Sequence, residues 1–254
     1  MFKNRIIDWL EDYRIKTDCK GVVLGISGGK DSTVCAMLAK KVWGDDVFGI
    51  IMPNGAQKDI DDAIKVCESI GIDYRIVNIE TIYNNLILNV ENRLTTKENI
   101  DWVENCPKIS EKAKTNIPPR IRMTILYSVA QTLGYRVMGT GNASERFIGW
   151  FTKWGDGAHD FNPLAHFTCS EVVDLGLELC EEFKLPKELI KKIPADGLTG
   201  KSDEDNFGFT YKQLDDYIQE HTSGNYLADE KIEKLHKQSK HKLKMPYTTW
   251  DKLE

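Results

Sequence analysis

Four short apolar runs alternate, over the first 140 residues, with longer segments whose apolar side chains recur every three or four positions. Such short runs, rich in β-branched and aliphatic residues, are typical of buried strands, and the longer segments are typical of amphipathic helices. The expected strands cover residues 21–26, 47–52, 72–77 and 135–138. The expected helices cover residues 2–16, 33–41, 59–70, 80–93 and 120–133. This alternation predicts an α/β fold, a doubly wound parallel sheet with flanking helices.

The second half of the chain shows helical periodicity and no further strand pattern. Helices are expected over residues 170–183, with Ser170 as the N-cap, and over 186–192, 211–220 and 229–241. Three segments carry no clear pattern: residues 95–117, which Pro118 and Pro119 should separate from the next helix, and two loops at 139–163 and 196–208. A long glycine-rich loop inside a domain is usually functional. Without a repeat or a linker, residues 1–254 are expected to form a single domain.

The first apolar run leads into the sequence Ser27-Gly28-Gly29-Lys30-Asp31-Ser32. In a parallel sheet, ligands bind beyond the carboxyl ends of the strands, where this turn lies. The two glycines permit a sharp turn close to a ligand, and the next helix directs its N–H groups and positive dipole end at the turn. The segment therefore predicts a cradle for a phosphate group.

Asp31 is the unusual member of this cradle, because a carboxylate repels phosphate unless a divalent cation lies between them. Oxygen ligands suit Mg²⁺, so Asp31 indicates a magnesium site. The alternative is that Asp31 only caps the following helix. A second glycine-containing segment, Gly139–Ser144, lacks the third glycine of a dinucleotide-binding motif and is not expected to open a helix, which argues against a dehydrogenase.

The charge balance and the cysteines limit the remaining classes. Lys and Arg number 34 against 39 for Asp and Glu, a net charge of −5, which argues against broad nucleic-acid binding. No apolar run is long enough to cross a membrane, and the N-terminal segment contains acidic residues that a signal peptide lacks, so a cytoplasmic protein is expected. The six cysteines form no C-x-x-C pair and are expected to be reduced thiols, mostly in the core.

The cradle resembles the pyrophosphate loop of the ATP pyrophosphatases, and later segments narrow the resemblance. Residues 139–145 and 149–164 closely resemble the G-T-G-N-x-S-E…G-Y-x-T-K-Y-G-D-G-x-x-D…P-L sequence of ammonia-dependent NAD synthetases. Residues 116–123 resemble that family's N-I-x-x-R-x-R-M, and His241-Lys242 resembles its C-terminal pair. The matches run in order from Gly21 to Lys242, which covers nearly the whole chain.

The resemblance implies an acid–ammonia ligase that catalyses the last step of NAD⁺ biosynthesis. ATP would adenylate the carboxylate of nicotinate adenine dinucleotide (deamido-NAD⁺), and ammonia would displace AMP to give NAD⁺ and pyrophosphate. Negative charge gathers on phosphate in both steps, which calls for Mg²⁺ and for N–H or cationic donors. Glutamine-dependent relatives carry an additional glutaminase domain; none is expected here, so free ammonia is the expected donor. The family also forms homodimers, and residues 120–133 with the preceding segment are the expected interface.

The resemblance also implies roles for individual residues. Asp31 and Glu145 match the Mg²⁺ ligands, and Asp156 matches the position that receives ammonia; these three are the expected catalytic residues. The expected ATP contacts are Gly25, Ile26, Ser27, Gly28, Gly29, Lys30, Asp31, Ser32 and Thr140. The expected contacts to deamido-NAD⁺ are Arg120, Lys153, Asp160, His241 and Lys242. Around Lys153, the aromatic residues Trp150, Phe151 and Trp154 suggest a stacking surface for a planar ring, or alternatively a small core beneath the loop.

The chain departs from the family pattern at two ATP contacts. Cys169 stands where many members have lysine, and Ala195 stands where they have a hydroxyl residue. Lys201 could replace the lost cation if its loop closes over ATP. Two other functions remain open: another ATP pyrophosphatase, of the tRNA-thiolating or GMP synthetase type, and a non-catalytic adenine-nucleotide sensor.

Overall fold

The computed structural model describes residues 2–57, 59–94, 108–192 and 202–246, and in them the four expected strands form one parallel sheet. The strands are β1 (Val22–Gly25), β2 (Val47–Ile51), β3 (Asp73–Ile76) and β4 (Arg136–Val137). They pair in the order β3-β2-β1-β4, so the chain reverses its winding direction between β1 and β4. Such a reversal opens a crevice at the carboxyl ends of the two strands, which is where open α/β sheets bind ligands.

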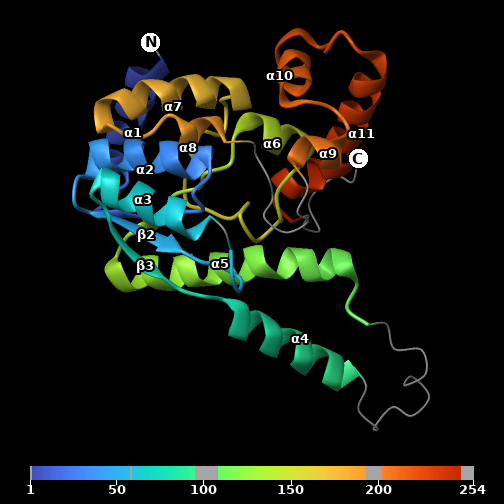
Figure 1. Cartoon of the computed structure of the whole chain (residues 1–254), viewed down its shortest axis with the longest axis horizontal. Helices are drawn as coiled ribbons and strands as arrows, with labels where there is room; N and C mark the ends of the chain where they lie inside the picture. Colours follow the sequence, from blue (N-terminus) through green and yellow to red (C-terminus); the bar gives the residue numbers. More distant parts are fainter. Residues whose placement is uncertain (1, 58, 95–107, 193–201, 247–254) are drawn as a thin grey trace.

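Helices cover both faces of the sheet, as the doubly wound prediction requires (Figure 1). One layer contains α1 (Phe2–Lys16), α2 (Lys30–Trp43), α3 (Ile60–Ile70), α7 (Cys169–Phe183) and α8 (Glu188–Lys191). The other contains α5 (Glu111–Leu133), with α4 (Glu80–Leu94) packed on its far side. Side chains of β1 pack into both layers. Val22 and Leu24 belong to the core under the first layer, and Val23 belongs to the core under α5.

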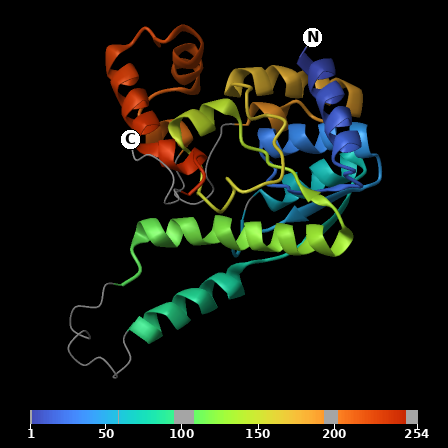
Figure 2. The same ribbon diagram turned by 180° about the vertical axis from the view of Figure 1, so that it is seen from behind.

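A further group of helices lies beside the sheet (Figure 2). It consists of α6 (Ala143–Ile148), α9 (Asp203–Phe207), α10 (Tyr211–Glu220) and α11 (Tyr226–Leu243). These helices have an apolar core of their own, built from Ile148, Phe207, Leu214, Ile232 and their neighbours. Because α6 is short and follows β4 closely, this group is held near the carboxyl ends of the strands.

The expectation that Pro118 and Pro119 interrupt the chain before a helix is wrong. Helix α5 begins at Glu111, with Ser110 as its N-cap, and continues through both prolines to Leu133. Interior prolines remove backbone hydrogen bonds, so they need compensation elsewhere. Here Pro118 is buried, and a Cβ built on Gly155 would lie 2.9 Å from Pro119 Cβ, so the prolines pack closely against the glycine-rich loop.

Several helix ends differ from the expected positions because side-chain caps decide them. Thr168, not Ser170, caps α7 in a capping box with Glu171. Asn142 caps α6 inside the expected loop, and Ser202 caps α9 in the second one. Helix α11 begins three residues earlier than expected, after Asn225.

The start of α2 shows that the alternative role of Asp31, a cap of the following helix, is wrong. The helix begins at Lys30, with Gly29 at the N-cap position and no side-chain cap bond. Asp31 therefore lies in the first turn and does not cap the helix.

The cysteines are buried, as expected, wherever the structure describes them. Five of the six are free thiols in the interior, and Cys106 lies outside the described residues. Over the same described ranges, the helices are all too short or too polar to span a lipid bilayer.

Candidate active site

The turn between β1 and α2 is fixed by its own hydrogen bonds. Ser27 Oγ lies 3.0 Å from Ser32 Oγ and accepts a bond of 3.2 Å from the backbone N–H of Gly29. Gly28 has a φ of +77°, and a Cβ there would lie 2.9 Å from the carbonyl oxygen of Asp59. Glycine is thus needed at this position for a left-handed turn against the start of α3, which confirms the expected sharp turn; close approach to a ligand stays a prediction.

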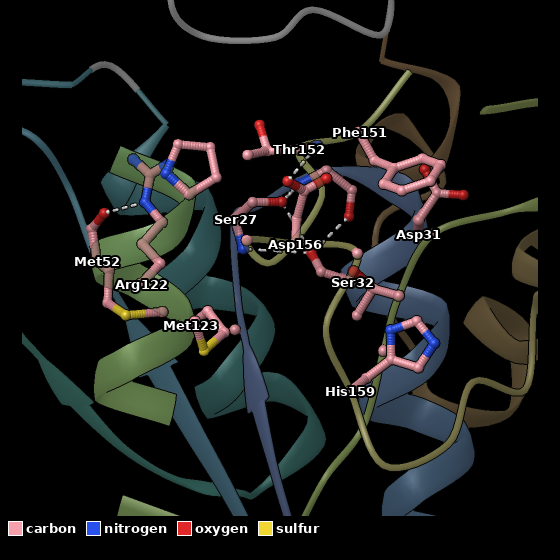
Figure 3. Close-up of a pocket in the computed structure, with 18 of the residues that line it drawn as sticks. Ser27, Asp31, Ser32, Met52, Arg122, Met123, Phe151, Thr152, Asp156 and His159 are labelled. Carbon is pink, nitrogen blue, oxygen red and sulfur yellow. Dashed lines mark hydrogen bonds between the residues drawn. The ribbon is translucent and has the colours of Figure 1, made fainter. Parts of the chain in front are cut away.

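A pocket of about 650 Å³ opens in front of this turn (Figure 3). Its walls are the carboxyl ends of β1, β2 and β4, the first turn of α2, one side of α5 and the glycine-rich loop. The expected site residues that line it are Gly25, Ile26, Ser27, Gly29, Lys30, Asp31, Ser32, Thr140, Glu145, Asp156 and Lys242. Residues more than 200 positions apart in the chain therefore meet at one crevice.

Asn142 holds the two expected metal ligands together. Its side-chain amide donates a 3.0 Å hydrogen bond to Asp31 Oδ1, and its backbone N–H donates a 3.2 Å bond to Glu145 Oε2. Asn142 is itself fully buried and caps α6 through a 3.0 Å bond from the Glu145 N–H. The loop after β4 thus places Glu145 next to the carboxylate on α2.

Charge in this cluster is partly compensated by Lys30. Burial and the neighbouring Asp31 raise the pKa of Glu145 to about 8, although the Lys30 ammonium acts in the opposite direction. Burial by itself lowers the pKa of Lys30, but Asp31, Cys169 and Glu145 together raise it above its usual value. Lys30 Nζ lies 2.8 Å from Asp31 Oδ2, so a buried lysine remains charged beside the carboxylate pair.

The donor set fits a magnesium ion that takes most of its ligands from elsewhere. Asp31 and Glu145 offer hard oxygen ligands at the mouth of a phosphate cradle, and Mg²⁺ in phosphate-transferring sites typically uses one or two carboxylates plus phosphate oxygens and water. In the part of the chain that the structure describes, no three His, Cys, Asp or Glu side chains form a complete metal cage.

Asp156 lies on the glycine-rich loop, and its side chain faces the pocket (Figure 3). Its Oδ1 accepts a 2.9 Å hydrogen bond from the Thr152 N–H. The carboxylate is open to the pocket, yet the surrounding protein removes enough water to raise its pKa, while the Thr152 N–H, Lys242 and Arg122 lower it. Asp156 is therefore a carboxylate with a somewhat elevated pKa, next to the phosphate cradle.

Comparison with known proteins identifies the family of this chain. Residues 2–246 match the family model described as NAD synthase. An NH₃-dependent NAD⁺ synthetase of Pyrococcus furiosus is 39% identical, with 95% of this chain and 93% of the relative aligned. Two solved structures are similar over nearly their full length: an NMN synthetase from Francisella tularensis (TM-score 0.83, 32% identity, 98% of both chains) and an NH₃-dependent NAD synthetase from Campylobacter jejuni (TM-score 0.75, 25% identity, 97% of both chains).

The chain belongs to the NAD synthase family.

Membership of the NAD synthase family confirms three expectations from the sequence. They are the recognised resemblance, the ATP pyrophosphatase type of α/β fold and the class of carbon–nitrogen ligase that uses ATP. It also removes support from the alternatives of a tRNA-thiolating enzyme, a GMP synthetase subunit and a nucleotide sensor.

Four of the five expected dinucleotide contacts do not line this NAD synthase pocket: Arg120, Lys153, Asp160 and His241. The guanidinium of Arg120 donates two 3.4 Å hydrogen bonds to the carbonyl oxygen of Lys153, and Lys153 Nζ donates a 2.6 Å bond to the carbonyl oxygen of His241. These three residues are near one another but do not line the pocket. The carboxylate of Asp160 accepts a 2.8 Å bond from the backbone N–H of Val137 in β4.

Lys242 is the member of this set that reaches the pocket. Its Nζ donates bonds of 2.6 and 2.7 Å to the carbonyl oxygens of Gly149 and Phe151. Burial lowers the pKa of Lys242, while Asp156 raises it. Lys242 therefore fixes the glycine-rich loop from the C-terminal helix.

Arg122 and Asn142 are site residues that our sequence reasoning missed. Arg122, on α5, lines the pocket opposite Asp31, and its Nε donates a 3.0 Å bond to the carbonyl oxygen of Met52 (Figure 3). Burial lowers the pKa of its guanidinium, and Asp156 raises it. Signals for both were present in the NAD synthase motifs: Arg122 is the second arginine of R-x-R-M, and Asn142 precedes Glu145 by three residues, the spacing of a capping box.

Trp150, Phe151 and Trp154, the three aromatic residues of the glycine-rich loop, were expected to form either a stacking surface or a small core. Trp150 packs edge-on against Phe207, with ring centroids 4.7 Å apart, so it belongs partly to the helical core. Phe151 lines the pocket below Lys242 Nζ, and Trp154 is half exposed beside Lys153 Nζ. They do not form one continuous stacking surface.

The glycine-containing segment after β4 also differs in part from its expected conformation. Asn142 opens α6 directly after it, so the expectation that no helix begins there is wrong. A Cβ on Gly139 would lie 2.5 Å from the ring of His159, so this glycine makes room for a side chain rather than for a dinucleotide.

Cys169, which stands where many family members have lysine, is a neutral group. Burial raises the pKa of the Cys169 thiol to about 12, although Lys30 lowers it. A positive charge is nevertheless present in this part of the site, because Lys30 and Cys169 are close enough to influence each other's pKa. Ala195 and Lys201 lie outside the described residues.

Proposed function

We propose that this protein catalyses the ATP-dependent amidation of deamido-NAD⁺ by ammonia, with NAD⁺, AMP and pyrophosphate as products. The observation that carries the proposal is the meeting of the phosphate cradle, the Asp31–Glu145 pair and Asp156 in one pocket of a chain that belongs to the NAD synthase family. The curated relative from Pyrococcus furiosus, aligned over 95% of this chain, is named an NH₃-dependent NAD⁺ synthetase.

In the first step, the cradle residues hold ATP by its phosphates. The N–H groups at the start of α2, the hydroxyls of Ser27 and Ser32, Thr140 and the Lys30 ammonium donate to phosphate oxygens. An oxygen of the nicotinate carboxylate attacks the α-phosphorus, the bond to the bridging oxygen breaks, and pyrophosphate leaves. Asp31 and Glu145 would hold Mg²⁺, which neutralises phosphate charge when bound.

In the second step, Asp156 holds ammonium beside the adenylated carboxyl group and takes one of its protons. Ammonia attacks the carbonyl carbon, the carbon–oxygen bond to AMP breaks, and the amide loses its remaining extra proton to the phosphate oxygens or to water. Arg120, Lys153, Asp160, His241 and Lys242 form the proposed contacts to the rest of deamido-NAD⁺. Of these, Arg120, Lys153 and His241 need to release their present backbone partners or to bind through outward-facing atoms.

The similar structure from Francisella tularensis suggests a second candidate substrate, because that protein is named an NMN synthetase. The name implies amidation of nicotinate mononucleotide, which carries the same reacting carboxylate without the AMP half. The proposed chemistry at Asp31, Glu145 and Asp156 is identical for both substrates, so only contacts at the rim distinguish them.

We also propose that residues 1–254 act as one synthetase domain that uses free ammonia, and that two copies associate. The support for association is a stripe of exposed apolar side chains on α4, at helical spacing: Ile82, Leu86 and Val90. Because α4 packs on α5, this stripe extends the interface expected at residues 120–133.

The decisive experiment supplies purified protein with ATP, Mg²⁺ and ammonium, and with either deamido-NAD⁺ or nicotinate mononucleotide. Chromatography measures NAD⁺, NMN and AMP, and a parallel reaction replaces ammonium with glutamine. NAD⁺ formed with ammonium and a higher kcat/KM for deamido-NAD⁺ support the proposal. A higher kcat/KM for the mononucleotide would assign the second substrate, and formation of neither amide would overturn both.

A further inference from the structure

Lys30 places a positive charge inside the phosphate cradle before any ligand arrives. Its side chain is only 3% exposed, and its Nζ lies 2.8 Å from Asp31 Oδ2 and 5.4 Å from the ring centroid of Tyr211. An ammonium group this deeply buried is tolerated only with an anionic partner. In the structure described here, that partner is Asp31.

The two oxygens of Asp31 have different partners. Oδ1 is held by the amide of Asn142, itself buried, whereas Oδ2 is held by Lys30. Asn142 also binds Glu145 through its backbone, so the carboxylate pair is fixed from one side and neutralised by Lys30 from the other. A divalent cation held by Asp31 and Glu145 would lie near the Lys30 ammonium, and two neighbouring cations repel each other.

We propose that Lys30 is the resident counter-ion of the metal site and couples metal binding to phosphate binding. In the empty site, Lys30 neutralises the carboxylates and opposes binding of a divalent cation alone. When nucleotide and metal arrive together, Asp31 turns to the metal and the Lys30 ammonium pairs with phosphate oxygens, so neither charge is left buried without a partner. This proposal rests on the metal and ATP sites of the proposed function and concerns the order in which they fill.

The proposal predicts opposite effects of one substitution on the two ligands. Without nucleotide, Lys30→Met should bind Mn²⁺, a paramagnetic substitute for Mg²⁺, about tenfold or more tightly than the wild type, because the competing cation is gone. With EDTA and no divalent cation, the same variant should bind ATP about tenfold or more weakly, because a phosphate partner is gone. Electron paramagnetic resonance measures free Mn²⁺, and calorimetry measures ATP binding.

Lys40→Met is the matched control, because Lys40 lies on the same helix and pairs with the exposed Asp45. It should change neither affinity. Lys30→Gln, which keeps a hydrogen-bond donor for Asp31 without its charge, is the second variant and should move both affinities in the same directions as Lys30→Met.

A general loss of structure would weaken both ligands, so opposite shifts exclude it. Unchanged or weaker Mn²⁺ binding in the Lys30 variants would overturn the proposal. Folding of these variants only in the presence of Mn²⁺ would support it, since the metal then replaces the lysine, and failure to fold even with Mn²⁺ would overturn it.

The outcome is separable from that of the proposed function, since neither measurement needs a nicotinate substrate. If the wild type makes NAD⁺ but the Lys30 variants show no opposite shifts in affinity, the proposed function is supported and the proposed coupling is overturned. Opposite shifts in a protein that amidates neither substrate would leave the coupling standing alone.

Discussion

At the scale of single residues, the site depends on side chains that position charge rather than react. Asn142 is the clearest case, because one buried amide residue binds Asp31 through its side chain and Glu145 through its backbone. Ser27 and Ser32 play the same part for the cradle, where they bond to each other and to the turn. The reacting groups can therefore be arranged before ligands bind, which lowers the reorganisation needed during the reaction.

Replacement of Asp156 with Asn should impair the use of ammonia specifically. The variant keeps an oxygen that can accept the Thr152 N–H but loses the charge and the proton acceptor, so kcat/KM for ammonium should fall by about 100- to 10,000-fold. The KM for ATP should change little. Initial rates of NAD⁺ formation against ammonium and ATP concentrations measure both, and Asp45→Asn, an exposed aspartate, is the control.

The pH dependence gives the same variant a second measurement. In the proposed mechanism Asp156 acts as a carboxylate. Because its pKa is raised, wild-type kcat/KM for ammonium should fall as the pH drops through a value above the usual aspartate pKa of about 3.9. The ratio of wild-type to variant rates cancels the titration of ammonium itself. A ratio that does not change with pH would contradict this role for Asp156.

How well the site residues could be predicted depends on how far apart their partners lie in the sequence. Asp31 and Ser32 were identifiable because the strand, turn and helix that explain them are contiguous. Asn142 and Arg122 each stand in a motif of the family, but their importance comes from contacts with Asp31 and Met52 across the fold, which the motifs by themselves do not reveal. Arg120, Lys153 and His241 were identifiable only through the family resemblance.

At the scale of elements, the starts of two helices are held by a third. Asp215, buried on α10, accepts hydrogen bonds from Ser144 Oγ in α6 and, at 2.8 and 2.6 Å, from Ser170 N and Oγ in α7. Ser144 in turn accepts a 2.9 Å bond from the Cys169 N–H. This cluster connects the helix that carries Glu145 to both the sheet layer and the C-terminal helices.

Replacement of Asp215 with Ala should therefore destabilise the protein far more than replacement of its neighbour. It removes the common acceptor of one buried donor, Ser144 Oγ, and two part-buried donors on Ser170, which should lower the free energy of unfolding by about 3 kcal/mol. Asp216→Ala, which breaks an exposed pair with Lys212, should change it by less than about 0.5 kcal/mol. Urea unfolding followed by circular dichroism measures the free energy of unfolding of both variants. Equal decreases would show that the Asp215 cluster does not contribute more to stability than the exposed pair.

The elements that the sequence predicted well are those with strong periodicity, and the errors come from caps and tertiary contacts. Strand β3 lies at the edge of the sheet with mostly exposed residues, so the buried strand expected there is wrong, and β4 has only two residues. Strands β1 and β2 and helices α2, α3, α7 and α10 follow their apolar patterns closely. Helix α5 did not, because the expected break at Pro118 and Pro119 is offset by packing against Gly155. Helices α6 and α9 are only six and five residues long, too short for a periodic signal, and depend on their caps at Asn142 and Ser202.

At the scale of the whole molecule, α4 is the part with the least cover. Both views show it beyond α5, away from the sheet (Figures 1 and 2). Leu86→Glu introduces a charge into the exposed stripe and should convert a dimer to a monomer, since an apolar interface does not accommodate an unpaired carboxylate. Light scattering coupled to size-exclusion chromatography measures the mass.

The control for this prediction is Ile15→Glu, on α1, where a single isoleucine is 77% exposed outside the stripe. It should leave the mass unchanged. A wild type that is monomeric at micromolar concentration, or a Leu86→Glu variant that remains dimeric, would rule out α4 as the interface.

The anchoring of the glycine-rich loop by Lys242 has a consequence for synthesis of the chain. A ribosome releases the phosphate cradle early, and the sheet around it can form while the C-terminal helices are still being translated. Until His241 and Lys242 emerge and bond to the loop at Lys153, Gly149 and Phe151, the loop that bears Asp156 lacks these contacts with α11. The proposed nucleotide cradle can thus form before α11 contacts the loop that bears Asp156, and the proposed activity requires both.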